Sequence, residues 1–288
     1  MITATLVNDL RKKTNAGMMD CKKALTETNG DIEAAVKLLR EKGIAKSASK
    51  SDREATEGII TARVSADAKS GVLLEVNCET DFVSRNDQFQ AFVAELADAV
   101  AGSGAADHAA ALQAPFEDST VEESVKARVL TVGENVQFRK YVRFEVAGEG
   151  AIASYIHMGG KVGVLIEVGA TKPETAGTDG FRELIKDLTL HIAASAPRGL
   201  SRDDIPAEVV EAEKDIFRVQ LADSGKPANI IENILVGKMA KFFSESCFLE
   251  QGFVKDPDTT VAKLVEAKGK ELGDTLSVRR FVRFGLGE

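Results

Sequence analysis

The sequence predicts an α+β fold built from two related halves. Residues 71–76, Gly-Val-Leu-Leu-Glu-Val, recur at 163–168 with five of six positions identical. Residues 139–144 likewise recur at 279–284 with four of six identical. Each half therefore contains two strands, a helical stretch and a last strand. We expect two similar subdomains, each with helices packed on a small, largely antiparallel sheet.

Residues 1–43 are expected to form a domain of three short helices. Breaks at Asn15-Ala16-Gly17 and Asn29-Gly30 separate the helices, and the third runs from a cap at Asp31 to Gly43. A unit this small has a thin core, so we expect it to present a surface. Met18 and Met19 suit such a contact surface because thioethers are flexible, but methionine at helical spacing also fits plain core.

The spacing of the repeats reveals an insertion in the second half. The first motif is offset by 163 − 71 = 92 residues and the second by 279 − 139 = 140, which leaves 140 − 92 = 48 extra residues. Helical spacing on both sides of Ser224-Gly225-Lys226-Pro227 predicts two antiparallel helices, a projecting coiled-coil hairpin that serves contact or assembly. The predicted divisions after the first domain are a linker or partly helical tether at 44–56, a first subdomain at 57–147, a second at 148–200 and 247–288, and the hairpin at 201–246.

The last strand of the first half alternates polar and apolar residues. Tyr141, Arg143 and Glu145 fall on one face and the branched and aromatic residues on the other, which is typical of a sheet with one covered side. Basic and aromatic residues alternate in 139–144 and 279–284, and this pattern could bind single-stranded nucleic acid. A solvated sheet face explains it more simply.

Residues 79–83, Glu-Thr-Asp-Phe-Val, are expected to form a corner between a buried strand and a helix. The strand is the apolar run 71–76, and helical spacing resumes at Phe89. In one interpretation Thr80 or Asp81 caps the helix and Phe82 packs as a hydrophobic staple. In the other, Phe82 is an exposed wedge with a carboxylate beside it. The two are compatible, since capping would fix the corner that presents the ring.

Composition excludes several classes of protein. The 288 residues carry a net charge of −8 and are 44% apolar, as in an ordinary globular protein, and this charge argues against a general nucleic-acid binder. No apolar run approaches the roughly 18 residues of a membrane span, and residues 1–5 lack signal-peptide features. We therefore expect a cytoplasmic protein with a protein partner and without direct nucleic-acid or membrane binding.

Groups for catalysis are sparse. Cys21, Cys78 and Cys247 lie far apart without a Cys-x-x-Cys pair, so the sequence indicates neither a disulfide framework nor a zinc site. Pairing Cys78 with a distant histidine is the one nucleophile that can be drawn, and His191 among apolar neighbours reads as a core or groove histidine. Residues 159–163 lack the rest of a phosphate-binding loop and read as a hairpin turn. We expect no enzyme activity, no metal and no cofactor.

Three motifs together resemble the bacterial translation elongation factor Ts family. They are residues 10–25, which depart from the family pattern at Asn15, residues 75–83, and His191-Ile192-Ala193-Ala194. The resemblance implies a ubiquitin-associated-like N-terminal domain and a guanine-nucleotide exchange factor for elongation factor Tu. It leaves open whether the complex dimerises, and a binding or chaperone-like module without exchange is the alternative.

The resemblance also implies a set of contact residues. The corner Thr80, Asp81, Phe82 and Val83 would enter the partner's nucleotide domain, dislodge Mg²⁺ and release GDP. Lys255 departs from the family's usual Met, and no helix is expected after the last strand, which puts the C-terminal contacts in doubt. The further partner contacts implied are Met18, Met19, Lys22, Val132, Gly133, His157 and Val254.

Overall fold

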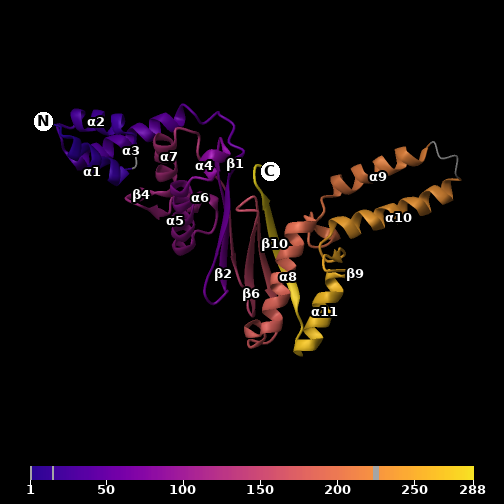
Figure 1. The fold of residues 1–288 in the computed structure, drawn as a ribbon. Coiled ribbons are helices and arrows are strands. Elements are labelled where there is room, and N and C mark those ends of the chain that lie inside the picture. Colours follow the sequence, from indigo (N-terminus) through magenta and orange to yellow (C-terminus); the bar gives the residue numbers. More distant parts are fainter. Residues whose placement is uncertain (1, 15, 223–226) are drawn as a thin grey trace.

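The computed structural model describes residues 2–14, 16–222 and 227–288 and has the predicted α+β fold. A helical unit lies at one end, two sheets with their helices lie in the middle, and a helical hairpin projects at the other end (Figure 1). Within these ranges, none of the helices combines the length and apolar character needed to cross a bilayer.

The N-terminal unit contains the three predicted helices, α1 (Ala4–Thr14), α2 (Met18–Glu27) and α3 (Ile32–Ala48). Asp31 caps α3 as predicted and accepts a bond from the Ala34 N–H at 3.0 Å. The predicted end of α3 at Gly43 is wrong, because Gly43 lies in the helix where it packs on α7: a Cβ there would come within 2.9 Å of Ala127 Cα. The predicted break at Asn15 lies outside the described residues.

Two antiparallel sheets of three strands form the centre, as predicted. The first has the order β1-β2-β5 and the second the order β10-β7-β6. Their strands are β1 (Glu57–Val64), β2 (Ser70–Cys78), β5 (Gln137–Glu145), β6 (Gly150–His157), β7 (Val162–Gly169) and β10 (Ser277–Gly285). The other elements of the halves are α4 (Asp81–Ser84), α5 (Asp87–Ser103), α6 (His108–Leu112), β3 (Pro115–Phe116), β4 (Ser119–Thr120), α7 (Val121–Val132), η1 (Thr175–Gly177), α8 (Asp179–Ser195), η2 (Arg202–Asp204), β8 (Gly252–Phe253), β9 (Asp256–Thr260) and α11 (Val261–Leu272).

The sequence repeat is also a repeat of contacts. The Ile60 N–H donates to the Gly160 carbonyl at 2.8 Å, and the Ile152 N–H donates to the Ala68 carbonyl at 2.8 Å. Both pairs of equivalent residues differ by 92 (152 − 60 and 160 − 68), so each half grips the other through the same bond. Helices α5 and α8 differ by the same 92 residues at both ends.

The two sheets pack against each other, and the helices cover their outer faces. Ile60, Leu73, Ile152 and Leu165 belong to the apolar cluster between the sheets. A second cluster joins β2 to α5 and α7, and a third joins β7 to α8 and α11. Strands β2 and β7 are the central strands of their sheets, with the other sheet on one face and helices on the other. Their residues are therefore buried on both faces, which explains their nearly continuous apolar sequences.

The prediction of a sheet with one covered, one solvated side is therefore wrong. The repeated strands contain Glu75 and Glu167, which are fully buried. Lys140 Nζ lies 3.1 Å from Glu75 Oε2, and Arg280 Nε lies 2.7 Å from Glu167 Oε2. A buried carboxylate is costly unless it is paired, so these basic residues are structural partners. Burial alone would raise the pKa of Glu167, but hydrogen bonds, with that from Arg279 the largest contribution, hold it below its usual value.

The predicted insertion forms a helical hairpin of α9 (Ala207–Ala222) and α10 (Ala228–Ser246). The Arg198 N–H donates to the Ser246 carbonyl at 2.8 Å, and the Phe248 N–H donates to the Gly199 carbonyl at 2.9 Å. The chain thus leaves the second half and returns at the same point. The predicted turn residues Ser224, Gly225 and Lys226 lie outside the described residues.

We predict that Gly163→Ala destabilises the fold by about 1–3 kcal/mol through overpacking between the sheets. A Cβ at Gly163 would lie 2.4 Å from Ile60 Cγ2 and 2.8 Å from Leu73 Cδ1. Urea unfolding measures the change. The control is Gly102→Ala in α5, where a Cβ would have no neighbour within 4 Å, and it should stabilise by up to about 1 kcal/mol. Equal stability of the Gly163 variant and wild type would contradict close sheet packing.

We also predict that replacing residues 201–244 by a short flexible linker leaves the two sheets folded. The ends of this segment are already adjacent, so little loop-closure entropy is lost. Circular dichroism should show the loss of helix expected for α9 and α10, with cooperative thermal unfolding retained. Loss of cooperative unfolding would show that the hairpin is part of the core.

Candidate functional site

The corner between β2 and α5 carries an exposed aromatic ring. The Phe82 side chain is 85% exposed, while Ser84 two residues later is buried. The hydrophobic-staple interpretation is therefore wrong, because the ring of a staple would be largely covered by its partner. Thr80 precedes α4 without capping it, and the cap of α5 is Asn86, which accepts bonds from the Gln88 and Phe89 N–H groups at 2.9 and 3.3 Å. The exposed-wedge geometry remains.

Thr80 does not cap because Glu134 holds it instead. The Glu134 carboxylate accepts bonds from the Glu79 N–H at 3.1 Å, the Thr80 N–H at 3.0 Å and the Thr80 hydroxyl at 2.7 Å. In return, the Glu79 carboxylate accepts a bond from the Asn135 N–H at 2.6 Å. We call these four hydrogen bonds the carboxylate clasp. Sequence reasoning missed Glu134, although its position after a helix-ending glycine recurs at Gly273-Asp274.

The clasp brings the end of α7 beside the corner. Phe82, Phe89, Arg128 and Val132 are among the residues lining a groove of about 260 Å³ next to the ring. Gly133 follows with a positive φ of 77°, and its N–H returns to the Val129 carbonyl at 2.9 Å, which ends the helix. The structure thus brings together two separately predicted groups, the corner residues and the pair Val132-Gly133.

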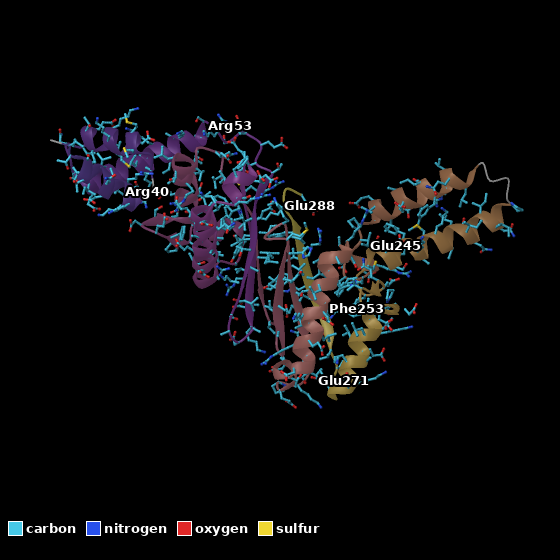
Figure 2. The ribbon with its side chains drawn as sticks, in the orientation of Figure 1. Arg40, Arg53, Glu245, Phe253, Glu271 and Glu288 are labelled. Carbon is cyan, nitrogen blue, oxygen red and sulfur yellow. The ribbon has the colours of Figure 1, made fainter. Side chains whose placement is uncertain are left out.

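The tether from the N-terminal helices is anchored at the same place. Asn135 Nδ2 donates to the Arg53 carbonyl at 2.8 Å, and Arg53 lies 3.6 Å from the Glu79 carboxylate. Lys50 Nζ donates to the Gly133 carbonyl. The C-terminal residues also reach this end of the sheets, where Gly287 lies against Thr56 (Figure 2 labels Arg53 and Glu288). The tether and the end of α7 therefore meet beside the corner, and the C-terminal residues contact the tether at Thr56.

The predicted contact residues of α2 form a separate exposed surface. Met18 and Met19 are 53% and 62% exposed, and Lys22 is exposed one turn after Met18. The core interpretation of the two methionines is therefore wrong, because Cys21 and Leu25 fill the interior face of the helix. This surface lies at the far end of the N-terminal unit, away from α4 (Figure 1).

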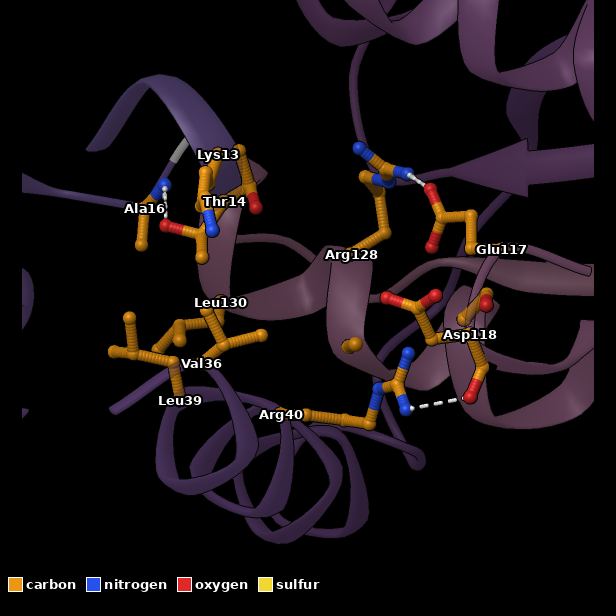
Figure 3. A pocket seen from close by; sticks show the side chains of 13 residues that line it. Lys13, Thr14, Ala16, Val36, Leu39, Arg40, Glu117, Asp118, Arg128 and Leu130 are labelled. Carbon is orange, nitrogen blue, oxygen red and sulfur yellow. Dashed lines mark hydrogen bonds and ion pairs between the residues drawn. The ribbon is translucent and has the colours of Figure 1, made fainter. Parts of the chain in front are cut away.

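A cavity of about 270 Å³ lies where the N-terminal helices meet the first half (Figure 3). Arg40 donates to the Asp118 carbonyl at 3.1 Å across it, and Arg128 lies 2.8 Å from Glu117. These cations already have partners within the chain. The cavity therefore belongs to the interface that holds the N-terminal unit, and Arg128 connects it to the groove beside Phe82.

His157 lies at the end of the sheets that also carries the corner. Its turn is fixed by an ion pair between Lys161 and Glu57, and Glu57 pairs with Cys78 at the end of β2. The exposed His157 ring accepts or donates a bond at 2.9 Å with the Tyr155 hydroxyl through Nδ1. The neighbouring Met158 is 72% exposed, so this turn presents an apolar tip.

Val254 is presented by the second half and is fixed by a buried histidine. Val254 is 46% exposed, and its N–H donates to His191 Nδ1 at 3.1 Å. Since Nδ1 accepts, Nε2 carries the proton and donates to Gln251 Oε1 at 2.9 Å. Burial lowers the pKa of His191, although the Gln251 bond opposes the shift. The interpretation as a satisfied core histidine is confirmed. Lys255 lies 2.7 Å from Asp187.

The Cys78 nucleophile is not supported by the geometry. Its thiol is buried and donates to the Thr80 carbonyl at 3.2 Å. Burial, with the nearby carboxylates of Glu134 and Glu57, raises the pKa of Cys78 to about 12. The thiol is therefore protonated at neutral pH, whereas nucleophilic cysteines need thiolate character. Cys21 and Cys247 are likewise buried free thiols.

Comparison with known proteins gives consistent matches. The family model described as "Elongation factor TS" matches residues 79–288. A protein named elongation factor Ts from Trichlorobacter lovleyi is 45% identical over 290 residues, which cover 100% of this chain and 93% of that protein. Proteins of the same name from Syntrophotalea carbinolica and Clostridium perfringens are 48% and 44% identical over 289 residues, covering 100% of this chain and 93% and 94% of those proteins.

The buried neutral His191 predicts a pH dependence of stability. Its pKa in the folded chain lies below the unfolded value of 6.5, so on acidification the unfolded chain takes up a proton first. The free energy of unfolding is therefore unaffected by His191 well above pH 6.5. It decreases as the pH falls from 6.5 toward the lower pKa of the folded chain. Urea unfolding between about pH 7.5 and 5.5 should show a steeper loss for wild type than for His191→Gln. If the free energy of unfolding had the same pH dependence in wild type and His191→Gln, His191 would not be a buried neutral histidine.

Proposed function

The chain belongs to the elongation factor Ts family, and on that premise we propose that it is a guanine-nucleotide exchange factor for elongation factor Tu. It binds the GDP-bound GTPase in the cytoplasm, dislodges Mg²⁺ and promotes GDP release so that GTP can bind. It makes and breaks no covalent bonds. In this proposal the three N-terminal helices α1 to α3 are a ubiquitin-associated-like partner-binding domain, and residues 201–246 are a coiled-coil hairpin that adds contacts.

The observation that carries the proposal is an exposed phenylalanine on a fixed corner. Buried aromatic residues dominate the binding energy of many protein interfaces, and a preorganised side chain loses little entropy when it binds. Phe82 is 85% exposed, while the three hydrogen bonds to Glu134 hold the backbone before it. Such a ring can enter a partner without a prior rearrangement of its own chain.

Asp81 is available beside the ring. Its carboxylate lies 3.1 Å from Arg85 in an exposed pair one helical turn apart. Exposed pairs of this kind contribute only about 0.3–0.5 kcal/mol. Asp81 can therefore leave Arg85 at little cost and compete for a cation or a backbone amide near the partner's Mg²⁺.

One ring is not sufficient for exchange. Shifting a site from almost fully closed to almost fully open requires a difference of about 5.5 kcal/mol in binding free energy, whereas burying one phenylalanine supplies about 1.5–3 kcal/mol. The remaining free energy has to come from other contacts that hold the partner while the corner distorts its nucleotide site. The surfaces proposed for this role are Met18, Met19 and Lys22 on α2, Val132 and Gly133 at the end of α7 beside the corner, His157, and Val254.

Thermodynamic linkage requires the effect to be reciprocal. If this protein lowers the affinity of the partner for GDP by some factor, then GDP lowers the affinity of the partner for this protein by the same factor. The protein is therefore expected to bind the nucleotide-free GTPase most tightly and to be displaced by fresh GTP.

The hairpin gives a specific reason to keep a second function in view. Ile216 and Val219 on α9 and Val236 on α10 are 51%, 74% and 64% exposed, so the hairpin offers apolar side chains that a partner could cover. A binding module that recruits partners without exchange would use this surface and would not need Phe82.

We predict that wild type accelerates release of fluorescent GDP from elongation factor Tu in stopped flow, and that Phe82→Ala accelerates it at least about tenfold less. Because Phe82 is exposed, its replacement should change stability by less than about 0.5 kcal/mol. The control is Glu174→Ala, since 82 + 92 = 174 makes Glu174 the exposed equivalent of Phe82 in the second half.

A Mg²⁺ series separates the possible outcomes. An advantage of wild type over Phe82→Ala that changes with Mg²⁺ concentration supports action at the metal. If Phe82→Ala accelerates GDP release as much as wild type does, exchange does not depend on the corner. If wild type does not accelerate release at all, the binding-module function is favoured.

A further inference from the structure

The carboxylate clasp at the corner has a counterpart in the second half. Asp274 occupies the position of Glu134, since 274 − 134 = 140, and it follows a glycine with φ of 65°, as Glu134 follows Gly133. Its carboxylate accepts bonds from the Thr171 N–H and the Lys172 N–H at 3.1 Å each, and from the Thr171 hydroxyl. Thr171 and Lys172 are equivalent to Glu79 and Thr80, offset by 92. Both halves therefore fasten the end of a buried strand to the helix that precedes the last strand.

The two halves carry different residues directly after the clasp. In the second half the chain continues with Pro173 and the exposed Glu174 into the short helix η1. In the first half it continues with Asp81 and the exposed Phe82. The residue after the clasp carboxylate is held in both halves: the Asn135 N–H donates to Glu79 in the first, and the N–H of the equivalent Thr275 donates to Asp274 at 2.6 Å in the second. The two clasps therefore hold equivalent backbone, and what differs is the residue that follows, an exposed phenylalanine in the first half and a glutamate in the second.

The position of Phe82 depends on the backbone before it. Its ring is almost fully exposed, and α4 has only four residues, too few to be stable alone. Val83 packs partly on the core after the ring, and Glu134 holds Glu79 and Thr80 before it. Without Glu134, two backbone N–H groups and one hydroxyl lose their acceptor at the start of the corner.

We propose that Glu134 is a positioning residue for nucleotide release, whose carboxylate fixes the backbone of Glu79 and Thr80 so that Phe82 is presented in one orientation. This inference rests on the proposed exchange function. Acceptor geometry carries the effect, so Glu134→Gln should preserve it: an amide oxygen can accept both N–H groups while the amide nitrogen donates to the Thr80 hydroxyl. Glu134→Ala removes all three bonds.

The test is fluorescent-GDP release from elongation factor Tu over a range of concentrations of this protein. Glu134→Ala should lower the plateau rate about tenfold, as misplaced groups do, while the concentration for half-maximal rate changes less than about threefold because the other surfaces remain. Glu134→Gln should recover most of the rate. The matched control is Asp274→Ala, which breaks the equivalent clasp without touching the corner and should leave the rate unchanged.

A double-mutant cycle separates positioning from general loss of structure. If Glu134 acts through the ring, Glu134→Ala should have little further effect in the Phe82→Ala background. Additive effects of the two substitutions would overturn the proposal. So would equal rates for Glu134→Ala and Asp274→Ala.

Thermal unfolding of each variant shows whether it is folded at the temperature of the assay. If Glu134→Ala is not folded, Glu134→Leu, which keeps much of the side-chain volume but has no hydrogen-bond acceptor, takes its place with the same expected direction and the same cycle. If wild type does not accelerate GDP release, the proposed exchange function is overturned. If wild type does so and the Glu134 variant is equally active, only the positioning role of Glu134 is overturned.

Discussion

The close contact of two sheets is the constraint on which the rest of this structure depends. Gly71 and Gly163, at equivalent positions of the repeat, have no room for a Cβ beside the facing sheet. Their strands are covered by a sheet on one face and helices on the other, so Glu75 and Glu167 become buried carboxylates. Basic residues of the last strands then pair with them, because unpaired buried charges are not tolerated.

Burial of the central strands also determines how the functional corner is built. Strand β2 is buried to its last residue, and the backbone N–H groups beyond it need acceptors where the strand ladder stops. Glu134 supplies them and leaves the next residues free to project. Cys78, at the end of the strand, is sealed beneath the corner as a protonated thiol. A structural requirement and the presentation of Phe82 are met by the same carboxylate.

The surfaces proposed for partner binding are spread along the molecule. The α2 surface and the hairpin lie at opposite ends, with α4 of the corner between them (Figure 1). The His157 turn lies at the same end of the sheets as the corner, through the ion pair of Lys161 with Glu57. The tether is hydrogen-bonded to Asn135, beside the clasp, so the N-terminal unit and the corner share one anchor. This arrangement suits an exchange factor, because free energy from distant contacts has to be applied at one corner.

Periodicity and repetition in the sequence determined the α+β class, the N-terminal helices, the paired strands and the inserted hairpin, because these depend on local spacing. The exposed corner was one of two open interpretations, and only the tertiary structure decided between them. Glu134 lies 54 residues from Thr80, and His191 lies 63 from Val254, so no local pattern encodes either contact. The roles of Arg279 and Arg280 were likewise mistaken for a solvated face, since alternation reports which side a residue points to but not what lies on that side.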